Sequence, residues 1–558
     1  MVCRNKTRDV ASFWWVAVAL VLATVAPPAM AVDFSAGDSD FKIRWDNTVK
    51  YSTGWRLINP SDELTNTMPQ TLNQDDGDRN FAKGFMQSRF DLLTELDASY
   101  KNVGVRVSGA GWYDFFYNTT NANTSPFTAN AVSVPYNQFT RTTQRLAGKQ
   151  FEILDAFVFA KIQAGEQAGS LKVGRHALQW GESLFFGANG IAGTMAPTDV
   201  MKLLGVPNAQ FKDIIMPVSQ ISAQWQFTPS LTVAAYYQLE WTRSRLPAVG
   251  SYYSSIDILD GGGERMIVGA PGGPFVAPPA FYRSGDMNAK NGGQYGVKVG
   301  LRAGETDFGL YFTNYHDKSP QIYLSPQAMP DFMTGQIGTY QLAFQQSIKA
   351  IGLSASRSVG VWSLAAEVSY KIDNDLVSDA QTILPIPGFL ADNSANPLYA
   401  IGDTFQAQAS WLATFGPSFI AEESSFLGEV AYNRTMKVTK NEAAIDPHTT
   451  RDAWGFRVIF EPMYRQALPG LDVSVPVGLG YNPKGTSQVV SSFNGGVGEG
   501  GDFNVGVSGT YLGVYKVSLS YTTYIGAAGT FLDANNYLSF KQSLKDRDTL
   551  NLSVRTTF

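Results

Sequence analysis

Three aspartates beside one glycine are the residues with the clearest potential for chemistry, namely Asp75, Asp76 and Asp78 with Gly77. Carboxylates grouped on one turn could bind Ca2+, which prefers oxygen ligands. The glycine comes too early after the acids for a helix–loop–helix calcium site. We therefore interpret the group as a turn whose aspartates accept hydrogen bonds from backbone amides, with Arg79 as the counter-charge, and we predict no metal site.

Histidine is the usual general base for a serine or cysteine nucleophile, and the sequence has three histidines, His176, His316 and His448. Neither G-x-S-x-G nor H-E-x-x-H occurs. Residues 496–501 satisfy G-x-G-x-x-G, but no parallel strand and helix flank them. We expect His316 to be solvated at the end of a predicted strand. The sequence predicts no enzyme and no cofactor, and carboxylate-only catalysis is the alternative that stays open.

The last stretch of the chain shows which kind of element positions these residues. One face of residues 547–558 carries Leu550, Leu552, Val554, Thr556 and Phe558, and the other carries Asn551, Ser553, Arg555 and Thr557. This period of two indicates a strand with an apolar and a polar side, as in the wall of a membrane barrel. The aromatic last residue resembles the signal by which barrels are handed to their assembly machinery. An edge strand of a soluble sandwich is the alternative.

The same alternation recurs along the chain. It appears near residues 41–51, 86–101, 103–113, 151–161, 170–176, 218–228, 231–242, 293–303, 306–316, 347–357, 361–371, 404–414, 424–434, 451–461, 470–481, 502–510, 513–524 and 547–558. These segments predict an all-β fold, a transmembrane antiparallel β-barrel of about 18 strands, with 16 possible.

The connections between these segments alternate in length. Short links are predicted at Asn102, Gly304-Glu305 and residues 462–469, for example, whereas long links cover 52–85, 114–150, 177–217, 243–292, 317–346, 372–403, 435–450, 482–501 and 525–546. A barrel with both ends in the periplasm requires short periplasmic turns and long outer loops. A soluble sandwich has no reason to sort its loops in this way.

The amino terminus reads as a secretory signal in residues 1–31, ahead of a barrel in 32–558. Basic residues precede an apolar run at 13–26, and Ala29-Met30-Ala31 predicts cleavage after Ala31. The run is shorter than the roughly 20 residues of a membrane anchor, which is the alternative. The only cysteine, Cys3, lies in this signal, so the mature chain would have no thiol. A net charge of -5 does not indicate nucleic-acid binding, which would require a basic surface.

The long connection 177–217 is the candidate plug or lid, in the lumen or at the barrel mouth. Thr198 could cap a short helix that ends at Gly205, and Pro207 could begin a second one. Amphipathic helices inside a loop need an apolar surface to cover. The candidate gate residues are Arg175, Trp180, Glu182, Leu203 and Phe211. Arg175 and Glu182 should pair or stay in water, and they could form an eyelet or a latch that holds the segment on the wall.

Three outer loops, 266–282, 320–340 and 383–399, are unusually apolar. Their candidate hydrophobic residues are Phe275, Phe281, Phe332 and Phe389. Exposed apolar patches of this size usually mark something bound. The alternative is that the loops bury against one another over the mouth. The candidate lumen residues are Arg89, Asp91, Glu95, Asp97, Glu367 and Arg555.

Several stretches resemble the proteobacterial envelope family catalogued as domain of unknown function 1302. They are residues 75–81, Gly174-Arg175 followed by Trp180-Gly181-Glu182, Pro217, residues 250–252, residues 294–296, and residues 314–318 with Pro320. Together with the strands they cover nearly all of the mature chain. The resemblance implies an outer-membrane location in Gram-negative bacteria, a link to envelope export pumps and the handling of hydrophobic compounds.

These observations predict an outer-membrane channel or transporter for hydrophobic or amphipathic small molecules or lipids. The expected partners are outer-membrane lipid, the transported molecule, the barrel assembly machinery and an export pump. A general diffusion porin is one alternative, and it would have an unplugged lumen. A structural partner of an envelope export complex that transports nothing is the other.

Overall fold

The computed structural model describes residues 32–33, 40–66, 68–207, 214–379, 382–383 and 391–558. The predicted signal at 1–31 and the candidate residues Phe211 and Phe389 lie outside this part of the chain. No helix in the described ranges is long and apolar enough to cross a bilayer.

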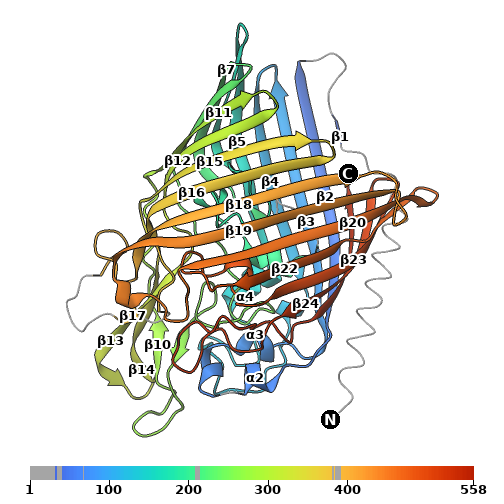
Figure 1. Ribbon diagram of the computed structural model, residues 1–558. Helices are drawn as coiled ribbons and strands as arrows, with labels where there is room; N and C mark the ends of the chain where they lie inside the picture. Colours follow the sequence, from blue (N-terminus) through green and yellow to red (C-terminus); the bar gives the residue numbers. More distant parts are fainter. Residues whose placement is uncertain (1–31, 34–39, 67, 208–213, 380–381, 384–390) are drawn as a thin grey trace.

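Eighteen antiparallel strands form one closed barrel (Figure 1). In ring order they are β2 (Phe41–Arg56), β3 (Gly84–Tyr100), β4 (Val103–Asp114), β5 (Lys149–Ala164), β6 (Gln167–His176), β7 (Val218–Thr228), β8 (Leu231–Gln238), β11 (Gln294–Ala303), β12 (Thr306–Tyr315), β15 (Ile348–Val359), β16 (Trp362–Asp375), β18 (Ile401–Phe415), β19 (Glu423–Lys440), β20 (Asp452–Leu468), β21 (Leu471–Ser474) with β22 (Val477–Lys484), β23 (Gly501–Tyr511), β24 (Tyr515–Ile525) and β25 (Thr549–Thr557). β25 pairs with β2, with Arg555 opposite Lys50. This pairing closes the ring and confirms the predicted count of 18.

The strands alternate between an apolar outer face and a polar inner face. On β16, Leu364 and Val368 are 44% and 41% exposed, whereas Glu367 between them is 2% exposed. Successive side chains of a strand point to opposite faces, so a period of two places apolar side chains on the outer face and polar side chains on the inner face. The outward Leu and Val side chains thus form a belt suited to acyl chains.

One predicted strand and one predicted turn differ from the structure. The predicted strand 470–481 is divided into β21 and β22 around Val475 and Pro476. Proline has no backbone N–H to donate to the ladder, and this explains the break. The predicted short link at 462–469 is mostly strand, because β20 continues through Pro462 to Leu468. The Pro462 carbonyl accepts a hydrogen bond from the Val475 amide at 3.0 Å.

The long connections gather at one end of the barrel, the lower end in Figure 1. Five short strands there form a second sheet that the alternation did not predict: β9 (Arg265–Ile267), β10 (Ala280–Arg283), β13 (Gln321–Asp331), β14 (Gln336–Ala343) and β17 (Thr382–Ile383). The short helices among the connections are α2 (Asp62–Thr65), η1 (Gln70–Asn73), α3 (Asp76–Arg79), η2 (Phe116–Asn118), α4 (Arg141–Thr143), η3 (Gln144–Gly148), η4 (Ala192–Thr194), α5 (Val200–Gly205), η5 (Glu442–Ala444) and η6 (Phe493–Gly495), and a short strand β1 (Val32–Asp33) pairs with β2.

The apolar loop residues pack mainly against one another. One buried cluster combines Trp241, Met266 and Phe281 of the connection after β8 with Leu324 and Tyr340 of the connection after β12. Mutual burial of the loops over the mouth, the alternative that the sequence left open, therefore holds for Phe281, which is 7% exposed.

Candidate functional site

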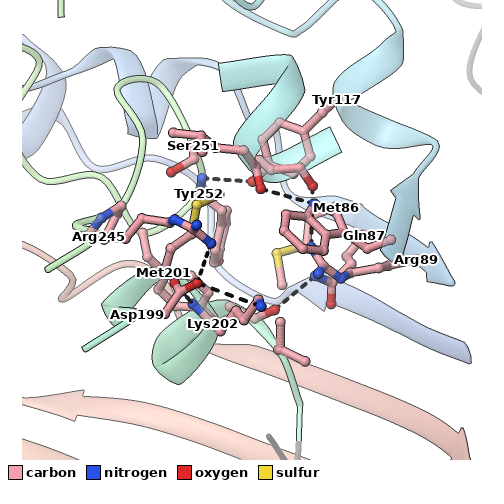
Figure 2. A pocket seen from close by; sticks show the side chains of 17 residues that line it. Met86, Gln87, Arg89, Tyr117, Asp199, Met201, Lys202, Arg245, Ser251 and Tyr252 are labelled. Atoms are coloured by element: carbon pink, nitrogen blue, oxygen red, sulfur yellow. Dashed lines mark hydrogen bonds and ion pairs between the residues drawn. The ribbon is translucent and has the colours of Figure 1, made fainter. Parts of the chain in front are cut away.

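A small cavity lies where the loops meet the inner wall, and Figure 2 shows its lining. β3 contributes Gln87 and Arg89, β4 contributes Trp112, and the connection after β8 contributes Tyr252 and Tyr253. The cavity measures about 30 Å3, so it holds water rather than an organic molecule in this conformation. Burial raises the pKa of the Tyr253 phenol to about 12, so this group is neutral at physiological pH.

Helix α5 forms one side of the cavity. The Asp199 carboxylate accepts a hydrogen bond from the Lys202 amide at 2.9 Å, as an N-cap residue does. The predicted cap, Thr198, is therefore wrong by one residue. The helix ends after Gly205, whose carbonyl accepts a hydrogen bond from the Gln87 side chain at 2.9 Å. This bond attaches the end of α5 to β3.

Four charged groups fix the start of α5 to β5 and to the connection after β8. Arg245 donates to Asp199 at 2.6 Å and to Glu152 of β5 at 2.8 Å. Lys202 donates to Glu152 at 2.6 Å, and its ammonium lies 4.7 Å from the ring centroid of Trp112. Figure 2 shows Arg245 and Lys202 pointing toward Asp199 from two sides. The two cations balance the two anions, so the network is formally neutral and largely shielded from water.

The first part of the same connection lies against the other side of the barrel. The Trp180 ring packs on Tyr236 of β8 and Tyr311 of β12, with centroids 5.1 Å and 6.4 Å away. The Glu367 carboxylate accepts hydrogen bonds from the backbone amides of Glu182 at 2.9 Å and Ile191 at 2.7 Å. Glu367, a predicted lumen residue, therefore holds the segment instead of facing open water.

Glu429 of β19 makes the most concentrated contact with this segment. Its Oε2 accepts hydrogen bonds from the backbone amides of Leu184, Phe185 and Phe186 at 2.5–3.0 Å, and from the Ser183 hydroxyl at 3.5 Å. Successive amides that converge on one anion form a nest. The sequence analysis did not single out Glu429, although its alternation with outward Val430 was a usable signal.

The two parts of the connection thus contact strands on opposite sides of the ring. Glu367 lies on β16, and Lys50 of β2 donates to the Pro207 carbonyl at 3.1 Å. Between β2 and β16, nine strands lie in one direction around the ring and seven in the other. Residues 180–207 therefore bridge nearly diametrically opposed strands. We call this stretch the bridging segment.

A second cavity, of about 50 Å3, shares Trp112, Lys202 and Val206 with the first one. Lys50, Asp91, Lys202 and Arg555 line it, and Lys50 is directly opposite both Asp91 and Arg555 in the strand register. The inner wall here carries more cationic than anionic groups.

The remaining predicted lumen residues form ion pairs on the inner wall. Arg89 donates to Asp91 at 2.8 Å. Arg106, which the sequence analysis did not single out, donates to Glu95 at 2.6 Å and to Asp97 at 3.0 Å. These pairs keep the charged groups of β3 and β4 on the polar side of the barrel.

The predicted gate residues do not form one cluster. Arg175 pairs with Glu240 at 3.1 Å and not with Glu182. Leu203 is 51% exposed, and it therefore does not cover an apolar surface as expected. Met201, two residues earlier on α5, packs against the loop cluster that contains Tyr252. The apolar face of this short helix was therefore assigned to the wrong residue.

The predicted hydrophobic loop residues divide into a buried and an exposed set. Phe275 and Phe332 stack edge to face with centroids 5.3 Å apart at the end of the β13–β14 hairpin. Around them Val276, Met329 and Met333 are 67%, 84% and 70% exposed, and Phe332 is 45% exposed. We call Val276, Met329, Phe332 and Met333 the apolar tip.

Two other sequence expectations need correction. His316 is fully buried, accepts a hydrogen bond from the Ser347 amide and contacts the Gly292 carbonyl, because the loops fold over the strand end. At the aspartate turn, Arg79 pairs with Asp75 as expected. Asp78, in contrast, binds the guanidinium groups of Arg56 and Arg547 rather than capping backbone amides.

The chain is similar to one family model and, at low identity, to several solved structures. A model of the family described as protein of unknown function DUF1302 matches residues 13–558. No curated protein matches the chain. Similar solved structures include OccAB3 of Acinetobacter baumannii, with 10% identity, a TM-score of 0.43, and 92% of this chain and 99% of that chain covered.

Two further solved structures are similar to this chain at comparable identity and coverage. OpdK of Pseudomonas aeruginosa, solved with vanillate, shares 12% identity over 92% of this chain and 98% of its own, with a TM-score of 0.40. OmpT of Vibrio cholerae shares 9% identity over 95% of this chain and 100% of its own, with a TM-score of 0.37. These values are too low to transfer residues or a substrate from those proteins to this chain.

Proposed function

This chain belongs to the DUF1302 family of proteins of unknown function, and we propose that it is an outer-membrane channel for hydrophobic or amphipathic small molecules or lipids. The proposal includes removal of residues 1–31 as a secretory signal. The closed barrel with an apolar outer belt supports the location, because only helices and closed barrels satisfy every backbone group inside a bilayer.

The bridging segment is the observation that carries the proposal. A general diffusion porin needs a wide water-filled bore. Here residues 180–207 contact β2 and β16, which lie nearly opposite each other, and the two cavities beside α5 measure only about 30 and 50 Å3. Passage of an organic molecule would then require the segment to shift, and the segment would act as a gate.

The lining of the cavities supports an amphipathic substrate. Trp112, Met201, Tyr252 and Val206 offer apolar surface, and the second cavity is lined by the cationic groups of Lys50 and Arg555 with Asp91 as its anion. A substrate with an apolar body and a polar or anionic end would find a partner for each part, in line with the usual build of ligand sites.

The apolar tip would collect the substrate at the mouth. A quadruple change of Val276, Met329, Phe332 and Met333 to serine should lower uptake of a hydrophobic fluorescent probe several-fold in a porin-deficient Gram-negative host. Surface changes of this kind usually alter stability little, so the barrel should still fold. The matched control is Phe419→Ser, since Phe419 is 99% exposed in a short turn and lies outside the tip.

Ion conductance in planar bilayers, measured together with probe uptake, tests the proposal. The gated channel predicts small, fluctuating conductance and protein-dependent uptake. Large steady conductance would instead identify a general diffusion porin. Neither conductance nor uptake would favour a structural partner of an export complex, a role that rests on the family resemblance alone.

A further inference from the structure

Three carboxylates from two different loops come together in the part of the chain that the structure describes. Asp75 and Asp76 lie at the start of α3, and Asp257 lies in the connection after β8. One oxygen from each lies within 4.8 Å of the other two. The residues are 0%, 6% and 0% exposed, so bulk water does not screen the charges.

Only one of the three carboxylates has a cationic side chain in direct contact among the residues that the structure describes. Asp75 pairs with Arg79, whereas Arg265 acts on Asp76, and Arg547 on Asp257, only from beyond 4.0 Å. Two buried carboxylates without a directly paired counter-ion are costly unless a cation or protons neutralise them.

Oxygen atoms without hydrogen-bond donors point to a bound cation. Asp257 Oδ2 accepts a hydrogen bond from the Asp76 amide at 3.1 Å, whereas Asp257 Oδ1 is buried and has no partner in the described chain. The buried Asn130 Oδ1 also has no donor, and the Asn130 amide donates to Asp76 Oδ2 at 3.0 Å. Hard oxygen ligands with a surplus of negative charge suit Ca2+.

We propose that Asp75, Asp76 and Asp257 bind one calcium ion, with Asn130 as a further oxygen donor. The ion would tie together three connections, those after β2, β4 and β8. These connections already touch, because a Cβ added to Gly77 would lie 2.3 Å from the Ser254 carbonyl. The connections after β4 and β8 also supply Tyr117, Ser251 and Tyr252 to the lining of the first cavity. The ion would therefore hold this part of the lining in place.

Calcium binding to the detergent-purified full-length barrel tests the proposal. After removal of metal with EDTA, titration calorimetry with CaCl2 should give one site per chain. The Kd should lie near the range of extracellular calcium modules, about 10−4–10−3 M. Calcium should raise the Tm, and Mg2+ should act more weakly, because it retains its water shell in a site that is largely dry.

Two variants locate the site. Asp257→Asn should weaken calcium binding about tenfold or more, because affinity follows the number of charged ligands. Asp331→Asn, a change at an exposed aspartate in the β13–β14 turn, should bind like the natural protein. If Asp257→Asn does not fold, the natural protein remains the test. The measurements are then the number of calcium ions bound per chain and the Tm with and without calcium. The absence of a calcium-dependent Tm shift, or unchanged binding by folded Asp257→Asn, would overturn the proposal.

Discussion

Glu429 shows how one residue can hold a loop in the lumen. Its carboxylate accepts hydrogen bonds from three successive amides, those of Leu184, Phe185 and Phe186. Glu429→Gln removes the charge and turns one acceptor into a donor. Because a hydrogen bond to a charged group contributes about 1.5–3 kcal/mol, we expect the bridging segment to loosen and the mean conductance in planar bilayers to rise. Glu166→Gln, in the exposed β5–β6 turn, is the control and should leave conductance unchanged.

Asp78 shows how one buried carboxylate can hold the loops together. Its carboxylate pairs with Arg56 and Arg547, and all three side chains are at most 1% exposed. Asp78→Asn leaves two buried guanidinium groups with less charge compensation, although Asp546 still pairs with Arg56. Breaking a buried pair typically costs about 3–5 kcal/mol. Equilibrium urea unfolding in detergent should therefore show a clear drop in stability.

An exposed ion pair provides the comparison for Asp78. Arg302 and Asp307 pair at 2.8 Å with side chains 62% and 52% exposed. Surface pairs contribute about 0–1 kcal/mol, so Asp307→Asn should hardly change the unfolding curve. Equal effects of the two substitutions would contradict the structural role of the buried network.

At the scale of elements, the gating role of the bridging segment can be tested by locking it. The Ile191 side chain packs on β15 at Gly352, where an added Cβ would lie 2.5 Å from Ile191 Cγ1. Changing Ile191 and Gly352 together to cysteine should allow a disulfide between segment and wall. The oxidised protein should lose uptake of the hydrophobic probe, and a reducing agent should restore it.

The two single cysteine variants are the controls for this lock. Neither can form the cross-link, since the only natural cysteine is Cys3, in the predicted signal. Their uptake should not respond to oxidant. If the cross-linked protein transports as well as the reduced one, the segment is a fixed latch and not a gate.

At the scale of the whole molecule, the ring depends on its last strand. β25 pairs with β24 on one side and with β2 on the other. Deletion of residues 549–558 would leave two strand edges unpaired, and unsatisfied backbone groups are not tolerated in lipid. The truncated chain should lose the fast-migrating folded form that closed barrels show in unheated SDS gels. Phe558→Ala keeps both ladders, so purified protein refolded in detergent should retain that form.

The sequence by itself determined the wall of this barrel. The number of strands, the residues that face lipid, and Arg89 and Glu367 as inward residues all followed from a period of two, which is a local property of the backbone. Breaks in the pattern were harder to place. Pro476 lies between two strands, whereas Pro462 lies within one, although both residues lack a backbone N–H.

Only the tertiary structure decided what the inward and loop residues touch. Glu429 and the amides of residues 184–186 are more than 240 positions apart in the sequence. Trp180 and its partner Tyr311 also lie on segments far apart in the sequence. The meeting of Asp257 with Asp75, and the burial of His316, likewise depend on how separate loops pack over the mouth. Local periodicity contains no information on such long-range contacts, so the sequence alone could not place the residues of the site.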